Sequence, residues 1–418
     1  MQKLLITGKR ELSGKILISG SKNATLPILA ASILSDNVKL TNVPLVKDTF
    51  TMVNLLEFIG LKIHIDKRKN ILKIRNSKKN IKTLAPYKLV RTMRAGVLVL
   101  GPLLVKYNKA KISLPGGCAI GSRPVDLHLF ALKRLGAKIK IKNGYIIAEA
   151  KKGLRGTKII FPNISVGATE NAVLAAFKAK GQTILENCAI EPEVKDLIKF
   201  LNKLGGKIRI VGRKIFINGH KKIKKKVSHE IIFDRIELGT YLIAAALVGK
   251  KIKLEGIDAS VIKNEIITLK KMGVKLKVKK TYIEVLRSKN IKKINIATKP
   301  YPGFPTDLQA QLMVLMTRAD GVSRIKENIF ENRFMHVSEL KRMGANIKIK
   351  NKTAIIEGPS KLTGAEVMAT DLRASVSLVL AGLVAENRTI INRIYHLDRG
   401  YEFLEKKLKN CKAHIKRI

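Results

Sequence analysis

The 418-residue sequence contains 82 Lys and Arg against 31 Asp and Glu, a formal net charge of +51, and 46% of its residues are hydrophobic. This hydrophobic content supports packed cores and excludes a globally disordered chain. Apolar runs are far shorter than the ~18 residues of a membrane span, the N-terminus lacks a secretory apolar segment, and three cysteines are too few for a disulfide framework. We expect a soluble, reduced, cytoplasmic protein with no membrane partner.

The positive charge is spread along the whole chain rather than gathered in one tail or domain. A basic protein can bind phosphate backbones, but Trp is absent and aromatic residues make up only 5%, which leaves few platforms for base stacking. Most of the excess is Lys beside Ile and Asn, as in IKIKNGY, KKIKKK and LKVKK, which we interpret mainly as compositional drift on solvated strand faces and loops. We therefore expect attraction of small polyanions, and no nucleic-acid partner beyond weak, nonspecific charge attraction.

Two kinds of helix recur along the chain, and both predict a repeated fold. Amphipathic helices end at a small residue and are followed by a Lys-rich alternating strand; these junctions lie at 58–65, 135–141, 204–210, 272–278, 343–349 and, in degraded form, 410–416. Helices rich in small apolar residues are expected at 21–34, 91–104, 166–179, 235–248, 306–319 and 371–384. Six such units predict a pseudo-symmetric α/β protein in two halves. The run KKIKKK within 219–229 predicts an exposed linker between them.

Each helix of the second kind opens with polar or glycine residues. They are Ser21, Lys22 and Asn23; Arg91 and Arg94; Ser165 and Gly167; Asp234, Arg235 and Glu237; Thr306 and Asp307; and Asp371 and Arg373. Helix N-termini favour anions, so convergence of these ends would form an anion site lined with cations and carboxylates. For any single residue, ordinary helix capping is the alternative, most plainly for Asp307.

A Gly- and Pro-rich loop at 114–124 contains Cys118, with Arg123 five residues later. A nearby guanidinium favours the thiolate, so Cys118 is a candidate reactive group, whereas Cys188 and Cys411 are expected to be inert packing residues. The seven His residues are dispersed, and no CxxC or HExxH motif occurs, so no metal site is predicted.

Several motifs together resemble the UDP-N-acetylglucosamine 1-carboxyvinyltransferases of the enolpyruvyl transferase family. They are SGSKNATLPIL at 19–29, LVRTMRAGVLVLGPLL at 89–104, LPGGCAIGSRPVDLHL at 114–129, ISVGATENAVLAA at 164–176, FPTDLQAQ at 304–311, FENRFMHVSEL at 330–340, ATDLRAS at 369–375 and YHLDRGYE at 395–402. The resemblance implies a two-domain inside-out α/β barrel of six βαβαββ-type repeats, with helices inside and sheets outside. It implies domains of 22–230 and of 1–21 plus 231–418, with the active site in the cleft between them.

The resemblance also implies the reaction and the residues that perform it. Enolpyruvyl transfer from phosphoenolpyruvate to the 3-hydroxyl of UDP-N-acetylglucosamine, with phosphate release, opens peptidoglycan synthesis and needs no metal or organic cofactor. Catalytic roles fall on Cys118 as general acid, Asp307 as acceptor of the hydroxyl proton, Lys22 and Arg399. Phosphoenolpyruvate would be bound by Lys22, Asn23, Arg123 and Arg399. The UDP-sugar would be bound by Arg94, Arg123, Pro124, Val125, Asp126, Leu127, Asn163, Ser165, Val166, Asp307 and Ile329, with Arg333, Asp371 and Arg373 lining the cleft.

One departure from the family pattern and two alternative functions accompany this interpretation. Many family members place Lys where this chain has Asn163, so a contact to the UDP phosphates is in doubt. The alternatives are a 3-phosphoshikimate enolpyruvyl transferase and a basic nucleic-acid-binding protein on the same fold. In this family, fosfomycin alkylates the cysteine that corresponds to Cys118.

Overall fold

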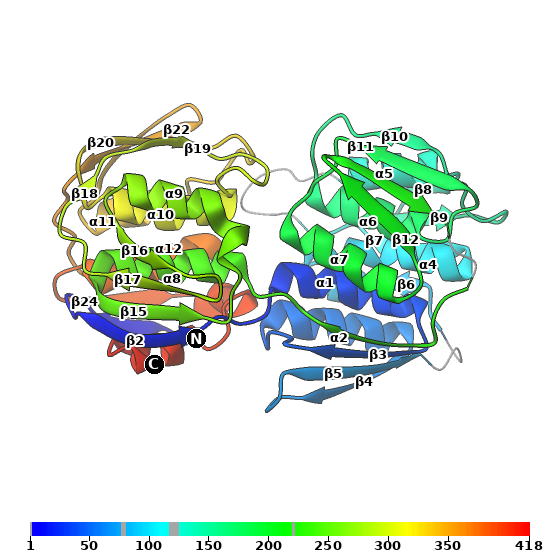
Figure 1. Ribbon diagram of the computed structural model, residues 1–418, viewed down its shortest axis with the longest axis horizontal. Helices are drawn as coiled ribbons and strands as arrows, with labels where there is room; N and C mark the ends of the chain where they lie inside the picture. The colour runs from blue at the N-terminus through cyan, green and yellow to red at the C-terminus, as the bar shows by residue number, and fades with distance from the viewer. Residues whose placement is uncertain (1, 77–80, 117–124, 220–221) are drawn as a thin grey trace. The chain divides into compact units, whose positions relative to one another are not determined.

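The computed structural model describes residues 2–76, 81–116, 125–219 and 222–418 (Figure 1). Its contacts divide the described chain into two compact units. Unit N contains residues 20–116 and 125–232, and unit C contains residues 2–19 and 233–418. Each unit has its own hydrophobic core. Every helix in the described residues is too short or too polar to traverse a lipid bilayer.

Unit N contains three four-stranded sheets in its described part. The strands are β3 (Asn37–Thr41), β4 (Leu61–Asp66), β5 (Ile71–Asn76), β6 (Leu84–Ala85), β7 (Lys109–Ser113), β8 (Lys138–Lys142), β9 (Tyr145–Glu149), β10 (Lys158–Ile160), β11 (Gln182–Glu186), β12 (Lys207–Val211), β13 (Lys214–Asn218) and β14 (Lys226–Glu230). The sheet orders are β14-β3-β5-β4, β6-β7-β9-β8 and β10-β11-β13-β12. In each sheet the first pair is parallel and the other pairs are antiparallel.

The helices of unit N pack against one another. They are α1 (Lys22–Ala31), α2 (Lys47–Ile59), α3 (Tyr87–Val90), α4 (Leu100–Tyr107), α5 (Asp126–Arg134), α6 (Val166–Ala176) and α7 (Pro192–Lys203), with 3-10 turns η1 (Ser32–Leu34) and η2 (Arg94–Val99). Helices α1 and α6 are buried along almost their whole length. Small residues permit this close packing: the backbone N–H of Gly101 in α4 donates a 2.9 Å hydrogen bond to the Asn171 side chain of α6.

Unit C repeats the same strand arrangement. Its strands are β1 (Leu4–Thr7), β2 (Leu12–Leu17), β15 (Gly249–Glu255), β16 (Lys275–Val278), β17 (Tyr282–Leu286), β18 (Ile291–Lys292), β19 (Asn295–Ala297), β20 (Ala319–Lys326), β21 (Asn346–Lys350), β22 (Thr353–Gly358), β23 (Glu366–Met368), β24 (Arg388–Asn392) and β25 (His414–Arg417). They form sheets of order β16-β17-β15-β2, β18-β20-β22-β21, with β19 also on β20, and β23-β24-β1-β25. Strand β1 therefore lies between two strands from the far end of the sequence.

The helices of unit C include three that pack against one another, α8, α10 and α12. The full set is α8 (Arg235–Val248), α9 (Lys263–Lys271), α10 (Gln309–Met316), α11 (His336–Arg342), α12 (Leu372–Val384) and α13 (Leu404–Asn410), with 3-10 turns η3 (Ala259–Ile262), η4 (Thr306–Leu308) and η5 (Ile394–Arg399). Every residue of α10 and nearly every residue of α12 is buried. The sheets surround these helices within the unit (Figure 1).

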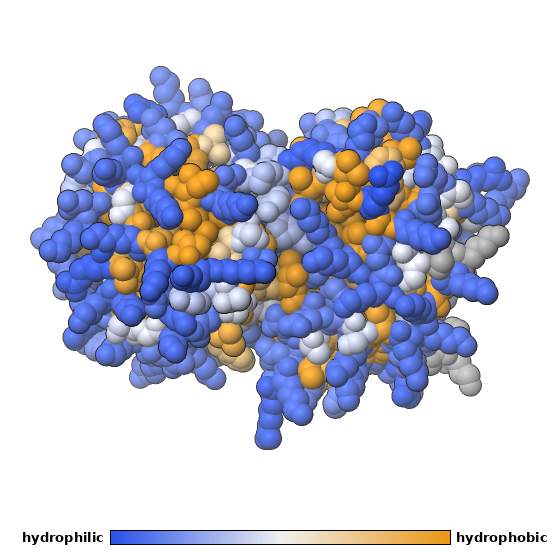
Figure 2. Space-filling view, viewed as in Figure 1, coloured by the Kyte–Doolittle hydropathy of each residue, from blue (hydrophilic) through white to orange (hydrophobic). Residues whose placement is uncertain are grey.

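The local sequence explains why the sheets have one buried and one exposed face and why helix α2 ends where it does. Along β22 the side chains of Ala354 and Ile356 are buried while Glu357 is exposed, so one sheet face packs on helices and the other meets water. Hydrophilic residues accordingly cover much of the face seen in Figure 2. Helix α2 ends at Gly60, whose φ of 118° suits glycine and whose N–H bonds the carbonyl of Leu56 at 3.1 Å.

The predicted α/β class is confirmed, and the six helices rich in small residues occur at the predicted positions, some beginning or ending in 3-10 turns. The predicted linker is wrong in part. Lys226–Glu230 forms β14, pairs with β3 in parallel and buries His229. The strand includes only the last Lys of KKIKKK and continues as Val-Ser-His-Glu, so the part of the predicted linker that is wrong is its C-terminal end. The closed inside-out barrel of six repeats stays a prediction.

Candidate functional site

Asp307 lies in unit C, in the turn η4 that leads into α10. The buried carboxylate of Glu327 supports this turn, because its Oε2 accepts a 2.9 Å hydrogen bond from the hydroxyl of Thr306. Its Oε1 accepts the backbone N–H groups of Ile329 and Phe330 at 2.8 and 3.1 Å. One carboxylate thus fixes the backbone next to Asp307 and the loop after β20.

Two buried arginines hold the carboxylate of Asp307. Nη2 of Arg333 lies 2.9 Å from Oδ1, and Nη2 of Arg373 lies 2.8 Å from Oδ2. The arginine side chains are 4% and 5% exposed, whereas the Asp307 side chain is 27% exposed. Burial lowers the pKa of Arg373, but the charge and hydrogen bond of Asp307 together with Tyr401 and the charge of Asp234 raise it by more, so the pKa is raised overall and Arg373 stays charged. The result is an accessible carboxylate held on both oxygens.

Arg373 is placed by the first turn of α12. Asp371 is the N-cap of that helix, and its Oδ1 accepts the N–H groups of Arg373 and Ala374 at 2.8 and 3.1 Å. His336 is buried nearby, and desolvation lowers its pKa to about 4 despite the opposing charge of Asp371. A neutral imidazole therefore lies among the arginines and acids of this region at neutral pH.

Arg399 lies at the end of η5 and is partly exposed. The neighbouring Asp398 is bound by Arg417, with Nη2 to Oδ1 at 2.8 Å and Nη1 to Oδ2 at 3.1 Å, and Arg417 also contacts Glu405 at 3.2 Å. This clamp ties η5 to α13 and β25. Burial and then the charge of Arg399 lower the pKa of His396.

Lys22 and Asn23 open α1 in unit N. Ser21 caps the helix by accepting the N–H of Ala24 at 3.3 Å. Lys22 is buried at 9% exposure, and its ammonium lies 3.3 Å from Oδ2 of Asp48 in the first turn of α2. Asn23 is partly buried. A buried cation at a helix N-terminus suits an anionic ligand.

The residues expected to bind the UDP-sugar occupy separate helix starts and loops. In unit N, Arg94 begins η2, Val125 precedes α5, Asp126 and Leu127 open α5, Asn163 is exposed, Ser165 caps α6 and Val166 opens it. Ser165 accepts the N–H of Ala168 at 3.3 Å, which matches the capping alternative. In unit C, Ile329 is 37% exposed beside the Glu327 carboxylate. The structure brings together Asp307, Arg333 and Arg373 in unit C. Cys118, Arg123 and Pro124 lie outside the described residues.

Several residues that contact the predicted site residues, or lie in the same helices, were not predicted from the sequence as part of this site. They are Glu327, Asp48, Gln311, Tyr401, Thr240 and Glu170. Glu170 is 4% exposed, and burial, followed by the charges of Glu193 and Glu191, raises its pKa well above the ordinary value. Within 164–176 the sequence places Glu170 inside an apolar helix, which was an available signal for a buried acid. For Glu327 and Asp48 we find no such local signal.

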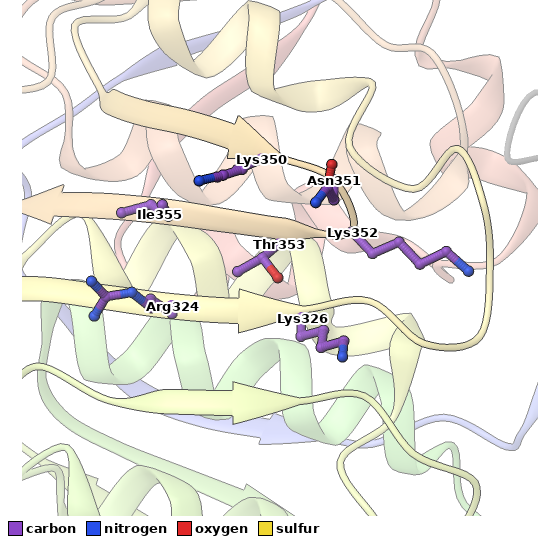
Figure 3. Close-up of a pocket in the computed structure, with 7 residues that line it drawn as sticks. All are labelled: Arg324, Lys326, Lys350, Asn351, Lys352, Thr353 and Ile355. Carbon is purple, nitrogen blue, oxygen red and sulfur yellow. The ribbon is translucent and has the colours of Figure 1, made fainter.

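A hollow of about 550 Å³ lies on the outer face of the β20-β22-β21 sheet (Figure 3). It is lined by Arg324, Lys326, Lys350, Asn351, Lys352, Thr353 and Ile355. None of these is a predicted site residue, and the lining contains no acid or nucleophile suited to enolpyruvyl transfer. The described residues also contain no group of three or more His, Cys, Asp or Glu side chains placed to hold a metal ion.

Comparison with known proteins gives a consistent result over the whole length. Residues 6–408 match the family model described as EPSP synthase (3-phosphoshikimate 1-carboxyvinyltransferase). UDP-N-acetylglucosamine 1-carboxyvinyltransferases from Pelagibacter ubique and Rickettsia akari are 57% and 52% identical to this chain, each over 420 aligned residues that cover 100% of both proteins.

Solved structures share the fold. The enolpyruvyl transferase NikO from Streptomyces tendae matches with a TM-score of 0.91 and 24% identity, covering 100% of this chain and 98% of that one. EPSP synthase from Acinetobacter baumannii matches with a TM-score of 0.78 and 18% identity, covering 100% of both chains. The resemblance seen in the sequence motifs is thereby confirmed, and the chain belongs to the enolpyruvyl transferase family, among the UDP-N-acetylglucosamine 1-carboxyvinyltransferases.

Proposed function

We propose that this protein transfers the enolpyruvyl group of phosphoenolpyruvate to the 3-hydroxyl of UDP-N-acetylglucosamine and releases phosphate. The observation that carries the proposal is the Asp307 carboxylate, which is accessible and yet held by two buried arginines. The full-length relatives support the choice of substrates. The proposal draws Lys22 and Asn23 from one unit, and Asp307 and Arg399 from the other, into one reaction.

The chemistry is an addition followed by an elimination. A proton added to the methylene carbon of phosphoenolpyruvate, a role given to Cys118, makes the adjacent carbon electrophilic. The sugar 3-hydroxyl adds to that carbon, and Asp307 takes its proton. Loss of a proton from the new methyl group and departure of phosphate then restore the double bond. Lys22, Arg123 and Arg399 would hold the phosphate and carboxylate groups.

Arg333 and Arg373 affect how strong a base the Asp307 carboxylate is. Two guanidinium groups favour the ionised carboxylate, which makes it ready to accept a proton but weakly basic. A weak base removes the hydroxyl proton as the new C–O bond forms and the oxygen becomes strongly acidic. This timing suits an electrophilic acceptor carbon, and it needs no free alkoxide.

Phosphate release measured with both substrates tests the proposal. The wild type should release phosphate only when phosphoenolpyruvate and UDP-N-acetylglucosamine are both present, and Asp307→Asn should lower kcat by roughly 10²–10⁴-fold. Asp320→Asn, at an exposed position on β20 of the same unit, is the matched control and should behave as wild type. No release with this substrate pair would overturn the proposal, and release with shikimate 3-phosphate instead would favour the alternative transferase. Tight nucleic-acid binding at physiological salt would favour the other alternative.

A further inference from the structure

Behind the Asp307 and Arg373 pair lies a buried polar network that the reaction scheme does not use. Its members come from three elements and one loop of unit C: Thr240 in α8, Gln311 in α10, Arg373 in α12 and Tyr401 after η5. Thr240 and Gln311 are fully buried, and Tyr401 is 4% exposed. A network at this depth can hold its members in one geometry, because water does not compete for their hydrogen bonds.

The phenol of Tyr401 is the centre of the network. Its oxygen lies 2.9 Å from Oγ1 of Thr240 and 3.3 Å from Nε2 of Gln311. Thr240 donates its one hydroxyl proton to the carbonyl of Ile236 at 2.8 Å, so Oγ1 can only accept from the phenol. Tyr401 therefore donates to Thr240. Burial is the largest cause that raises the pKa of Tyr401, which keeps the phenol protonated for this role.

Two links connect Tyr401 to the carboxylate. The guanidinium carbon of Arg373 lies 5.5 Å from the centre of the Tyr401 ring, in the range of a cation–π contact. Nε2 of Gln311, which also faces Thr240 and the phenol, donates to the backbone carbonyl of Asp307 at 2.9 Å. The ring thus supports the cation that grips Asp307, and the hydroxyl supports the amide that holds its backbone.

We propose that Tyr401 is a positioning residue for enolpyruvyl transfer, which holds Arg373 and Asp307 where the carboxylate accepts the proton of the attacking hydroxyl. This inference rests on the proposed function. Tyr401 acts through its neighbours and need not touch a substrate. A misplacement of a reacting group by about 1 Å can cost ~100-fold in rate, so the expected effect falls on kcat rather than on substrate affinity.

The test compares Tyr401→Phe, Thr240→Val and the double variant with the wild type by phosphate release. Each single variant should lower kcat about 10- to 100-fold and leave the KM of both substrates within about threefold. The loss in the double variant should be far smaller than the product of the two single losses, because both changes remove the hydrogen bond between Tyr401 and Thr240, although each also removes one contact of Gln311. Thermal unfolding should stay within a few degrees of the wild type.

Tyr241→Phe is the matched control. Tyr241 is as deeply buried, in α8, and its hydroxyl has no hydrogen-bond partner among the described residues. It should retain wild-type kcat, so an equal loss in this variant would mean that any buried phenol matters and would overturn the proposal.

Four other outcomes distinguish failure of the positioning role from failure of the proposed function. Tyr401→Phe with kcat within twofold of an active wild type overturns the positioning role and leaves the proposed function standing. Multiplying losses in the double variant also overturn it, because the two groups would then act independently. If Tyr401→Phe does not fold, Thr240→Val alone decides by the same kcat criterion. A wild type that releases no phosphate overturns the proposed function and this role together.

Discussion

Glu237 provides a quantitative prediction about pH and stability. Its carboxylate is 2% exposed in the first turn of α8, where Oε2 accepts the N–H of Ser19 at 2.7 Å and Oε1 lies 2.7 Å from the ammonium of Lys407. Burial raises its pKa from 4.5 to about 7, although the charge of Lys407 opposes the change. The folded protein therefore binds a proton here more tightly than the unfolded chain does.

The sign and size of the effect follow from linkage. Because the pKa of Glu237 is higher in the folded state, its protonation stabilises the fold in full below pH 4.5. This stabilisation is lost as the pH rises through about 7. This upward shift from 4.5 to about 7 corresponds to roughly 3 kcal/mol. Between pH 5.5 and 8.0 the wild type should lose about 2 kcal/mol from this group alone. At ~2–4 °C per kcal/mol for a unit of this size, the melting temperature should fall by about 4–8 °C.

Glu237→Gln removes this ionisation while keeping an acceptor for the N–H of Ser19. Its absolute stability will also reflect the lost ion pair with Lys407, so the informative quantity is the change between pH 5.5 and 8.0, measured by scanning calorimetry. The variant should lack the 4–8 °C fall that the wild type owes to Glu237. Glu331→Gln, an exposed control in unit C, should follow the wild type. The reasoning fails if the wild type and Glu237→Gln show the same pH dependence.

Three further predictions concern stability in both units. Glu170→Gln removes a buried carboxylate with a strongly raised pKa, so its melting temperature relative to the wild type should rise as pH increases from 5 to 8.5; a pH-independent difference would contradict this. Gly101→Ala should cost about 1–3 kcal/mol in denaturant titration, since a Cβ there would lie 2.7 Å from Oδ1 of Asn171; wild-type stability would show that α4 and α6 can separate cheaply. Arg417→Ala leaves Asp398 and Glu405 without their shared partner and should cost about 1–3 kcal/mol, with a matching rise in protease cleavage around η5; unchanged stability and cleavage would argue against the clamp.

Local pattern was sufficient for much of the fold. The stretch predicted as a helix at 371–384 forms α12 at Leu372–Val384, because its small apolar residues suit a helix buried all round and Asp371 supplies a cap. The strand β14 was misread as linker because its pairing with β3 joins residues about 190 positions apart, and no local signal reports such a pairing.

The candidate site, like the fold, could be predicted from the sequence only in part. Residue identities and family motifs pointed to Asp307, Arg333 and Arg373, but only the fold shows that arginines 26 and 66 residues away grip opposite oxygens of one carboxylate. Supporting groups such as Glu327 were missed because a glutamate directly after a strand that ends in Lys326 is indistinguishable in sequence from a solvated charge. Its burial is set by Thr298, Thr306 and the loop after β20, which come together only in three dimensions.

The placement of β1 has a consequence for synthesis on the ribosome. Leu4–Thr7 pairs with Arg388–Asn392 on one side and His414–Arg417 on the other, whereas unit N is complete once Ile232 has emerged. Strand β1 must therefore wait, unpaired, until the residues up to Arg417 have been translated, whereas the residues of unit N can already fold. Strand β1 is short and has basic residues on both sides. Both features disfavour pairing of its open edges with other chains during that delay.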